Sequence, residues 1–166
     1  IFPLNRISTD EFYVFIKQKF ERTEVSIEDD AVKLVLEATG SHPYYTQYLC
    51  HILYDLNEGP QIKAEDIPKA VDFLISRESG AYMNTWDLLT IRQRQALVAL
   101  SETPSGVTPL GSETLRKHGM SQPAVMMRAL NSLINKDLVD KESGRYEIVD
   151  VFFKKWIRSY IVQAQL

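Results

Sequence analysis

A single β-hairpin is predicted in a chain that is otherwise helical, at Leu138-Val139-Asp140-Lys141-Glu142-Ser143-Gly144-Arg145-Tyr146-Glu147-Ile148-Val149. Residues 138–141 and 145–149 are strand-like, because β-prone residues cluster there on either side of a turn signal. Glu142-Ser143-Gly144 supplies that signal with residue types that favour tight turns. The segment therefore predicts two short antiparallel strands.

Helical patterns flank this hairpin on both sides. Before it, three helices are expected, capped by Thr90, Ser112 and Ser121, and the second of them stops at Gly119. The third has an apolar inner face made of Met126, Ala129, Leu130 and Leu133. After the hairpin, Asp150 caps a final helix that bears Phe152, Phe153, Trp156, Ile157, Tyr160 and Ile161. Helix, helix, helix, hairpin, helix is the order of a winged helix-turn-helix domain.

The first half of the chain is predicted to be an all-α module of four short helices. A capping box, Ser8-Thr9-Asp10-Glu11, opens the first helix, whose apolar positions are Phe12, Phe15, Ile16 and Phe20. Ser26 opens the second, with an apolar face of Ala31, Leu34, Val35 and Ala38. Gly40 ends that helix, and the third runs from Pro43 to about Leu56. The fourth begins at 64–66 and carries Ile67, Val71 and Leu74.

The expected fold class is thus mainly α, with a four-helix bundle followed by a winged helix. The domains are predicted as residues 1–78 and 79–166, joined within 76–88. Charge supports two modules, because residues 1–85 hold 8 basic and 14 acidic residues, whereas 86–166 hold 11 and 8. No apolar run approaches the roughly 20 residues that span a bilayer. The single Cys50 fits a reducing compartment. The chain opens on Ile1-Phe2-Pro3-Leu4 without Met, and we expect an excised fragment.

Motifs for catalysis are not found, so we expect no catalytic residue and no metal site in this chain. Residues 106–113 come close to a phosphate-binding loop, but Ser112 and Glu113 stand where Lys and Ser/Thr are needed. His42, His51 and His118 lack the spacing of a zinc helix. The chain by itself is therefore predicted not to be an enzyme.

The predicted winged helix raises the question of DNA binding. With the apolar face inward, Arg128, Asn131 and Asn135 share the outer face of the third helix, and Lys136, Lys141 and Arg145 follow at its end and at the wing. Arg and Asn can read base edges, but duplex binding also needs several phosphate-neutralising cations. This set is small, and a solvated face explains it better than a DNA-binding face does.

The tyrosine-rich turn Gly40-Ser41-His42-Pro43-Tyr44-Tyr45-Thr46-Gln47-Tyr48-Leu49-Cys50 holds more aromatic surface than a helix connection needs. Its rings are expected either to pack the bundle or to meet a ligand or second domain. Together with 86–90, Gln93-Arg94-Gln95 and 150–156, this turn resembles the C-terminal half of prokaryotic AAA+/STAND-type P-loop ATPases. In that family a nucleotide-binding core precedes a four-helix lid, and a winged helix follows. The family sequence usually reads Gly-His-Pro-Tyr, and Ser41 is an extra residue here.

The resemblance implies that the lid turn folds over the adenine of a nucleotide held by the core. Gly40, His42, Pro43 and Tyr44 would then form one wall of the site, with ATP or ADP and Mg bound only in the full-length protein. The implied function is a cytoplasmic regulatory fragment of an ATP-binding switch, whose first partner is its own N-terminal P-loop core. The alternatives are a winged-helix transcriptional regulator with weak duplex DNA as partner, and an adaptor that binds another protein.

Overall fold

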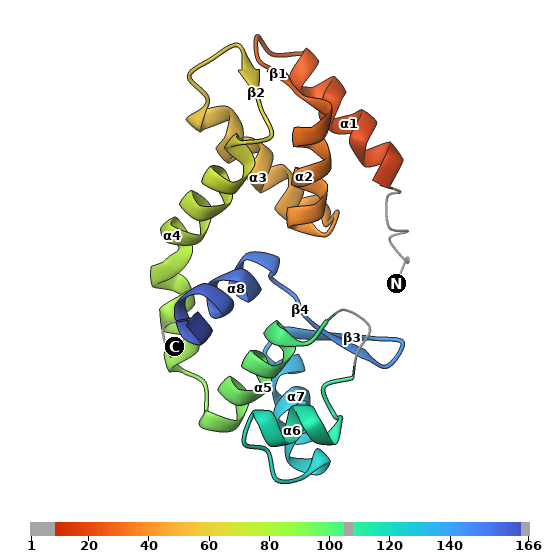
Figure 1. Ribbon diagram of the computed structural model, residues 1–166, viewed down its shortest axis with the longest axis vertical. Coiled ribbons are helices and arrows are strands. Elements are labelled where there is room, and N and C mark those ends of the chain that lie inside the picture. The colour runs from red at the N-terminus through yellow and green to blue at the C-terminus, as the bar shows by residue number, and fades with distance from the viewer. Residues whose placement is uncertain (1–8, 105–107, 164–166) are drawn as a thin grey trace. The chain divides into compact units, whose positions relative to one another are not determined.

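The computed structural model describes residues 9–104 and 108–163, and these fall into two compact units, 1–77 and 78–166 (Figure 1). Six helices and strands make up the first unit's described part: α1 (Thr9–Glu21), β1 (Ser26–Ile27), α2 (Asp29–Thr39), α3 (Pro43–Leu56), β2 (Gln61–Ile62) and the start of α4 (Asp66–Asp87). The second unit adds α5 (Ile91–Glu102), α6 (Ser112–Lys117), α7 (Pro123–Ile134), β3 (Val139–Glu142), β4 (Arg145–Ile148) and α8 (Val151–Trp156), which continues as a π-helical segment, Ile157–Val162.

The mainly helical class and the C-terminal hairpin are confirmed. Strands β3 and β4 pair antiparallel, with Val139 opposite Ile148 and Glu142 opposite Arg145. Ser143 and Gly144 turn the chain between them with φ of 51° and 81°. These left-handed values suit a tight hairpin turn and explain the Gly at its second position. The second unit is a winged helix.

The first unit is not all-α as predicted. Ser26 does not open a helix: it lies in β1, which pairs parallel with β2 through Ser26 opposite Gln61 (Figure 1). The Ser26 hydroxyl donates to the carbonyl oxygen of Pro60 at 3.2 Å, so it is not available as a helix cap. Helix α2 instead begins after Glu28, whose carboxylate accepts from the Ala64 amide at 3.3 Å.

The buried faces of α1 and α2 follow the predicted helical period, except that one apolar side chain of each helix is exposed. The buried face of α2 consists of Ala31, Val32, Val35, Leu36 and Thr39. Leu34, predicted on that face, is instead 36% exposed. In α1, Phe12, Ile16 and Phe20 are buried, but Phe15 is 41% exposed. The predicted capping box begins at Ser8, which lies outside the described residues.

Helix starts in the second unit are predicted to within one residue. Thr90 is confirmed as a cap, because its hydroxyl accepts from the Gln93 amide while the Gln93 side chain accepts from the Thr90 amide. Ser112 is the first residue of α6 and Gly111 takes the cap position. Gln122 rather than Ser121 precedes α7, with Pro123 at its first position.

The predicted join at 76–88 is mostly helical, because α4 continues to Asp87. The reason is that its last turns pack into the winged helix. The Trp156 indole donates to the Ser79 hydroxyl at 2.9 Å, and the Tyr82 hydroxyl donates to Asp150 at 3.1 Å. Trp86 and Trp156 meet edge-on at 6.2 Å between ring centroids. The aromatic side chains form a core. Their burial stabilises the helix here, although Ser79-Gly80 has a low helix propensity.

Candidate functional site

The turn between α2 and α3 has a backbone fixed by two left-handed residues. Gly40 has φ of 59° and Ser41 has φ of 55°, a region that residues with a Cβ rarely enter. The Ser41 amide donates to the Leu36 carbonyl at 2.9 Å, which is the six-residue closure of a Schellman motif. Pro43 then starts α3 with φ already set for a helix. The turn is therefore closed by hydrogen bonds of its own backbone.

Three aromatic rings surround this turn, and they differ in exposure. Tyr45 is buried at 8% exposure, whereas Tyr44 is 65% exposed. The Tyr45 ring contacts His42 at 4.7 Å and Tyr44 at 5.2 Å between centroids, the latter edge-on. The packing interpretation is confirmed for Tyr45, whereas Tyr44 and His42 are exposed.

Beneath the turn, a buried hydroxyl pair joins α2 to α3. The oxygens of Thr39 and Thr46 lie 2.8 Å apart, and both side chains are essentially fully buried. Thr39 also donates to the Val35 carbonyl at 2.8 Å. These bonds position the first turn of α3, and with it Tyr44 and Tyr45. The sequence predicted neither residue as important.

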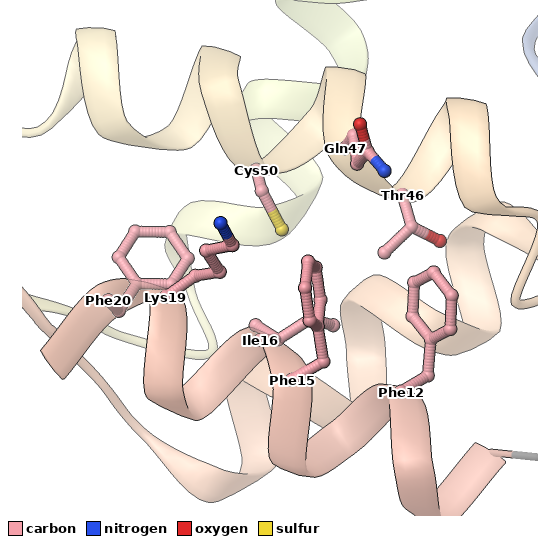
Figure 2. Close-up of a pocket in the computed structure, with 8 residues that line it drawn as sticks. All are labelled: Phe12, Phe15, Ile16, Lys19, Phe20, Thr46, Gln47 and Cys50. Atoms are coloured by element: carbon pink, nitrogen blue, oxygen red, sulfur yellow. The ribbon is translucent and has the colours of Figure 1, made fainter. Parts of the chain in front are cut away.

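Next to these hydroxyls, a groove of about 350 Å³ runs between α1 and α3. Figure 2 shows Phe15 and Lys19 rising from α1 toward Gln47 and Cys50 of α3. The Lys19 ammonium lies 5.3 Å from the centroid of the Phe15 ring. Burial raises the pKa of the Cys50 thiol to about 12, so at neutral pH it is protonated and a poor nucleophile. The groove offers an apolar surface with one cation.

In the winged helix, all six residues predicted as DNA contacts are exposed: Arg128, Asn131, Asn135, Lys136, Lys141 and Arg145. Two of the cations are engaged locally. The Arg128 guanidinium donates to the Ala124 carbonyl at 3.3 Å, and the Lys141 ammonium lies 5.1 Å from the Tyr146 ring centroid. Residues 112–148 contain six Lys and Arg residues and five Asp and Glu residues. This surface is therefore nearly neutral.

The three histidines do not form a common site. His42 lies at the turn, and His51 pairs with Asp55 at 3.4 Å one helical turn along α3. In the second unit the His118 ring approaches Glu102 at 3.4 Å. Burial lowers the pKa of His118, against the opposing effect of Glu102. In the described ranges there is no group of three or more His, Cys, Asp or Glu side chains placed to hold a metal ion.

Comparison with known proteins supports the winged helix. A family model described as a probable winged helix domain matches residues 80–159, just under half of the chain. The match starts inside α4, close to where the second unit begins. No curated protein matches the sequence. Across 9–104 and 108–163, the helices are too short or too polar to cross a membrane.

Proposed function

We propose that this chain is the C-terminal regulatory part of an ATP-binding switch protein of the AAA+/STAND type. The turn at Gly40, His42, Pro43 and Tyr44 supplies one wall of the nucleotide site, and the winged helix makes contacts within or between molecules. ATP or ADP with Mg is held by a P-loop core that precedes this region in the cytoplasmic full-length protein. The chain alone is not an enzyme.

The observation that carries this proposal is the exposure of Tyr44. Its ring is 65% exposed at the end of a turn whose backbone is already fixed by Gly40 and Ser41. The neighbouring Tyr45 satisfies the packing of the bundle, so Tyr44 is not needed there. A rigid aromatic edge with a polar tip is suited to contact a flat ring such as a nucleobase.

The chemistry of the turn fits a base and not a phosphate. Residues 40–48 contain no Lys or Arg, so nothing in this segment neutralises a phosphate charge. The first turn of α3 carries no acidic residue that would repel a nucleotide. In this proposal the turn contacts the adenine side, and the phosphates and Mg are bound by the core.

Regulation then follows from population shift. A nucleotide that contacts the turn in only one arrangement of lid and core favours that arrangement by its differential affinity. The exposed ring of Tyr44 is the group of this chain whose contacts would change between the two states. The winged helix is the part that passes this change to a partner.

The test is ADP titration of the protein that includes the upstream core, with Tyr44→Ala compared to Tyr54→Ala. Tyr54 is 46% exposed on the same helix but lies outside the turn, so it is a matched control. Stacking on a base contributes roughly 1–3 kcal/mol, so Tyr44→Ala is expected to weaken ADP binding about tenfold. Equal ADP affinity in both variants refutes the nucleotide role of the turn. Micromolar ATP binding to the 166-residue chain alone refutes the proposal that an upstream core binds the phosphates and Mg.

A second function, binding of duplex DNA, is favoured by the exposed outer face of α7. Arg128 and Asn131 offer base-reading groups there, and Lys141 lies at the wing. The near balance of charge predicts weak binding that falls steeply with salt. Fluorescence anisotropy with a labelled duplex, for wild type and Arg128→Ala/Lys141→Ala, measures it. Nanomolar, sequence-selective binding at physiological salt would make transcriptional regulation the better assignment.

A further inference from the structure

A second groove, of about 610 Å³, lies within the winged helix between α5, the end of α6 and the π-helical segment. Its apolar surface includes Ile91 and Tyr160, which are 73% and 47% exposed. The Tyr160 ring stacks on Trp156 at 6.0 Å with 16° between the planes, so its orientation is fixed. Val98 and Ile161 complete an aliphatic floor. Exposed apolar side chains gathered around a hollow are typical of a binding surface.

Basic side chains line the same groove. Arg94, Lys117 and His118 contribute to it, and no carboxylate does so among the described lining residues. Arg94 is held in place by two hydrogen bonds, from Nε to the Trp86 carbonyl at 3.0 Å and from Nη2 to the Asp87 carbonyl at 3.1 Å. These two bonds hold the guanidinium against the end of α4. A preorganised guanidinium binds a carboxylate with little further loss of entropy.

Two carboxylates lie within ion-pair distance of these cations. Glu102 approaches Lys117 at 3.2 Å, and the Asp87 carboxylate lies 3.7 Å from the Arg94 guanidinium. Neither carboxylate lines the groove. The groove lining itself therefore carries two permanent cations and no carboxylate, and each of these cations has a carboxylate partner outside the lining.

We propose that this groove binds a short acidic peptide segment of a partner protein, with one large apolar side chain as its anchor. The anchor lies on the aliphatic floor beside Ile91 and Tyr160. Carboxylates on either side of the anchor pair with Arg94 and Lys117. An apolar centre with a charged rim is the usual anatomy of a peptide interface, in which the anchor supplies most of the affinity and the rim the specificity.

A nucleic acid fits the groove less well than a peptide. Single strands bind by stacking bases on open aromatic faces, but Trp86 is only 7% exposed and Tyr160 already stacks on Trp156. The exposed floor is mainly aliphatic. Two lining cations, each beside a carboxylate, are too few to neutralise several phosphates.

The experiment uses the 166-residue chain and a fluorescein-labelled nonapeptide of sequence Asp-Glu-Glu-Asp-Leu-Asp-Glu-Glu-Gly. Anisotropy is expected to show saturable binding, lost when the peptide Leu is replaced by Ser. Ile91→Ser is expected to weaken binding about fivefold, because the anchor loses its apolar contact. Lys117→Gln is expected to weaken it about threefold, as for a partly exposed ion pair. Both residues are largely exposed, so both variants should fold.

Matched controls lie outside the groove. Leu88→Ser changes an apolar side chain that is 81% exposed, and Lys141→Gln removes an exposed cation at the wing. Neither is expected to alter peptide binding. Absence of saturable binding, or equal losses in controls and groove variants, overturns the proposal. Tighter binding of a twelve-nucleotide oligo-dT than of the peptide overturns it in favour of nucleic acid. Self-association in sedimentation that Ile91→Ser abolishes overturns it in favour of a second copy of the chain.

Discussion

Replacing Asp150 by Ala is expected to destabilise the winged helix by about 2 kcal/mol. Asp150 accepts hydrogen bonds from the amides of Phe152 and Phe153 at 2.8 and 3.0 Å, which makes it the N-cap of α8. Removing such a cap costs about 1 kcal/mol. Its second oxygen accepts from the Tyr82 hydroxyl at 3.1 Å, and loss of that bond costs about 1 kcal/mol more. The two terms act on different oxygens, so their sum is the expected loss.

Urea unfolding followed by tryptophan fluorescence measures this change, because both tryptophans of the chain, Trp86 and Trp156, lie in the second unit. Asp150→Asn keeps a competent cap and should lose less than about 1 kcal/mol. Tyr82→Phe should lose about 1 kcal/mol, and its effect should largely vanish in the Asp150→Ala background. Glu147→Gln, an exposed carboxylate on β4, is the control. A loss below about 0.5 kcal/mol for Asp150→Ala would refute the argument that this residue ties α4 to α8.

Three further changes test other parts of the fold. Gly119→Ala should destabilise the winged helix by about 1–2 kcal/mol in the same urea assay, because Gly119 has φ of 65°. Burial lowers the pKa of His118 below its ordinary value of 6.5, so the unfolded chain takes up this proton at higher pH than the folded one. Stability should therefore fall as pH drops through about 6.5, with no contribution above it, and His118→Gln should flatten the profile between pH 7.5 and 5.5. Thr46→Val should cost about 1 kcal/mol through the lost bond to Thr39, seen as faster hydrogen exchange in α2 and α3; unchanged exchange would contradict it.

Local signals in the sequence were sufficient for most of the second unit. The turn at Ser143-Gly144 and the caps at Thr90 and Asp150 each fix a boundary through bonds that span only a few residues. Errors of one residue at Ser112 and Ser121 have the same origin, since neighbouring residues compete for a cap position.

Features that depend on distant residues were not predictable in the same way. The pairing of β1 with β2 joins segments about 35 residues apart and has only two residues in each strand, too few for a periodic pattern. The length of α4 depends on Tyr82 and Trp86 packing against Trp156. A Ser-Gly sequence at residues 79–80 favours a linker locally, and tertiary packing overrides it.

For the candidate sites, the residue types could be predicted from the sequence, but the exposure of each side chain could not. It singled out the tyrosine turn, yet only the structure separates Tyr44, which is exposed, from Tyr45, which is buried. Neither groove was predicted. The first combines Phe15 and Lys19 of α1 with residues of α3, and the second combines α5 with the C-terminal segment. A groove is a property of packing between helices, and no single segment encodes it.

The start of the winged helix inside α4 also limits how this module can be moved between genes. A coding segment that begins at Ile91 would encode α5, α6, α7 and the wing, but it would omit Ser79, Tyr82 and Trp86. Trp156 would then lose the acceptor of its indole N–H and two of its aromatic neighbours. The smallest exchangeable piece of coding sequence therefore begins no later than the codon for residue 78. Recombination that fuses this module to a new protein must therefore carry over at least the last turns of α4, and a junction in the loop before α5 would not do so.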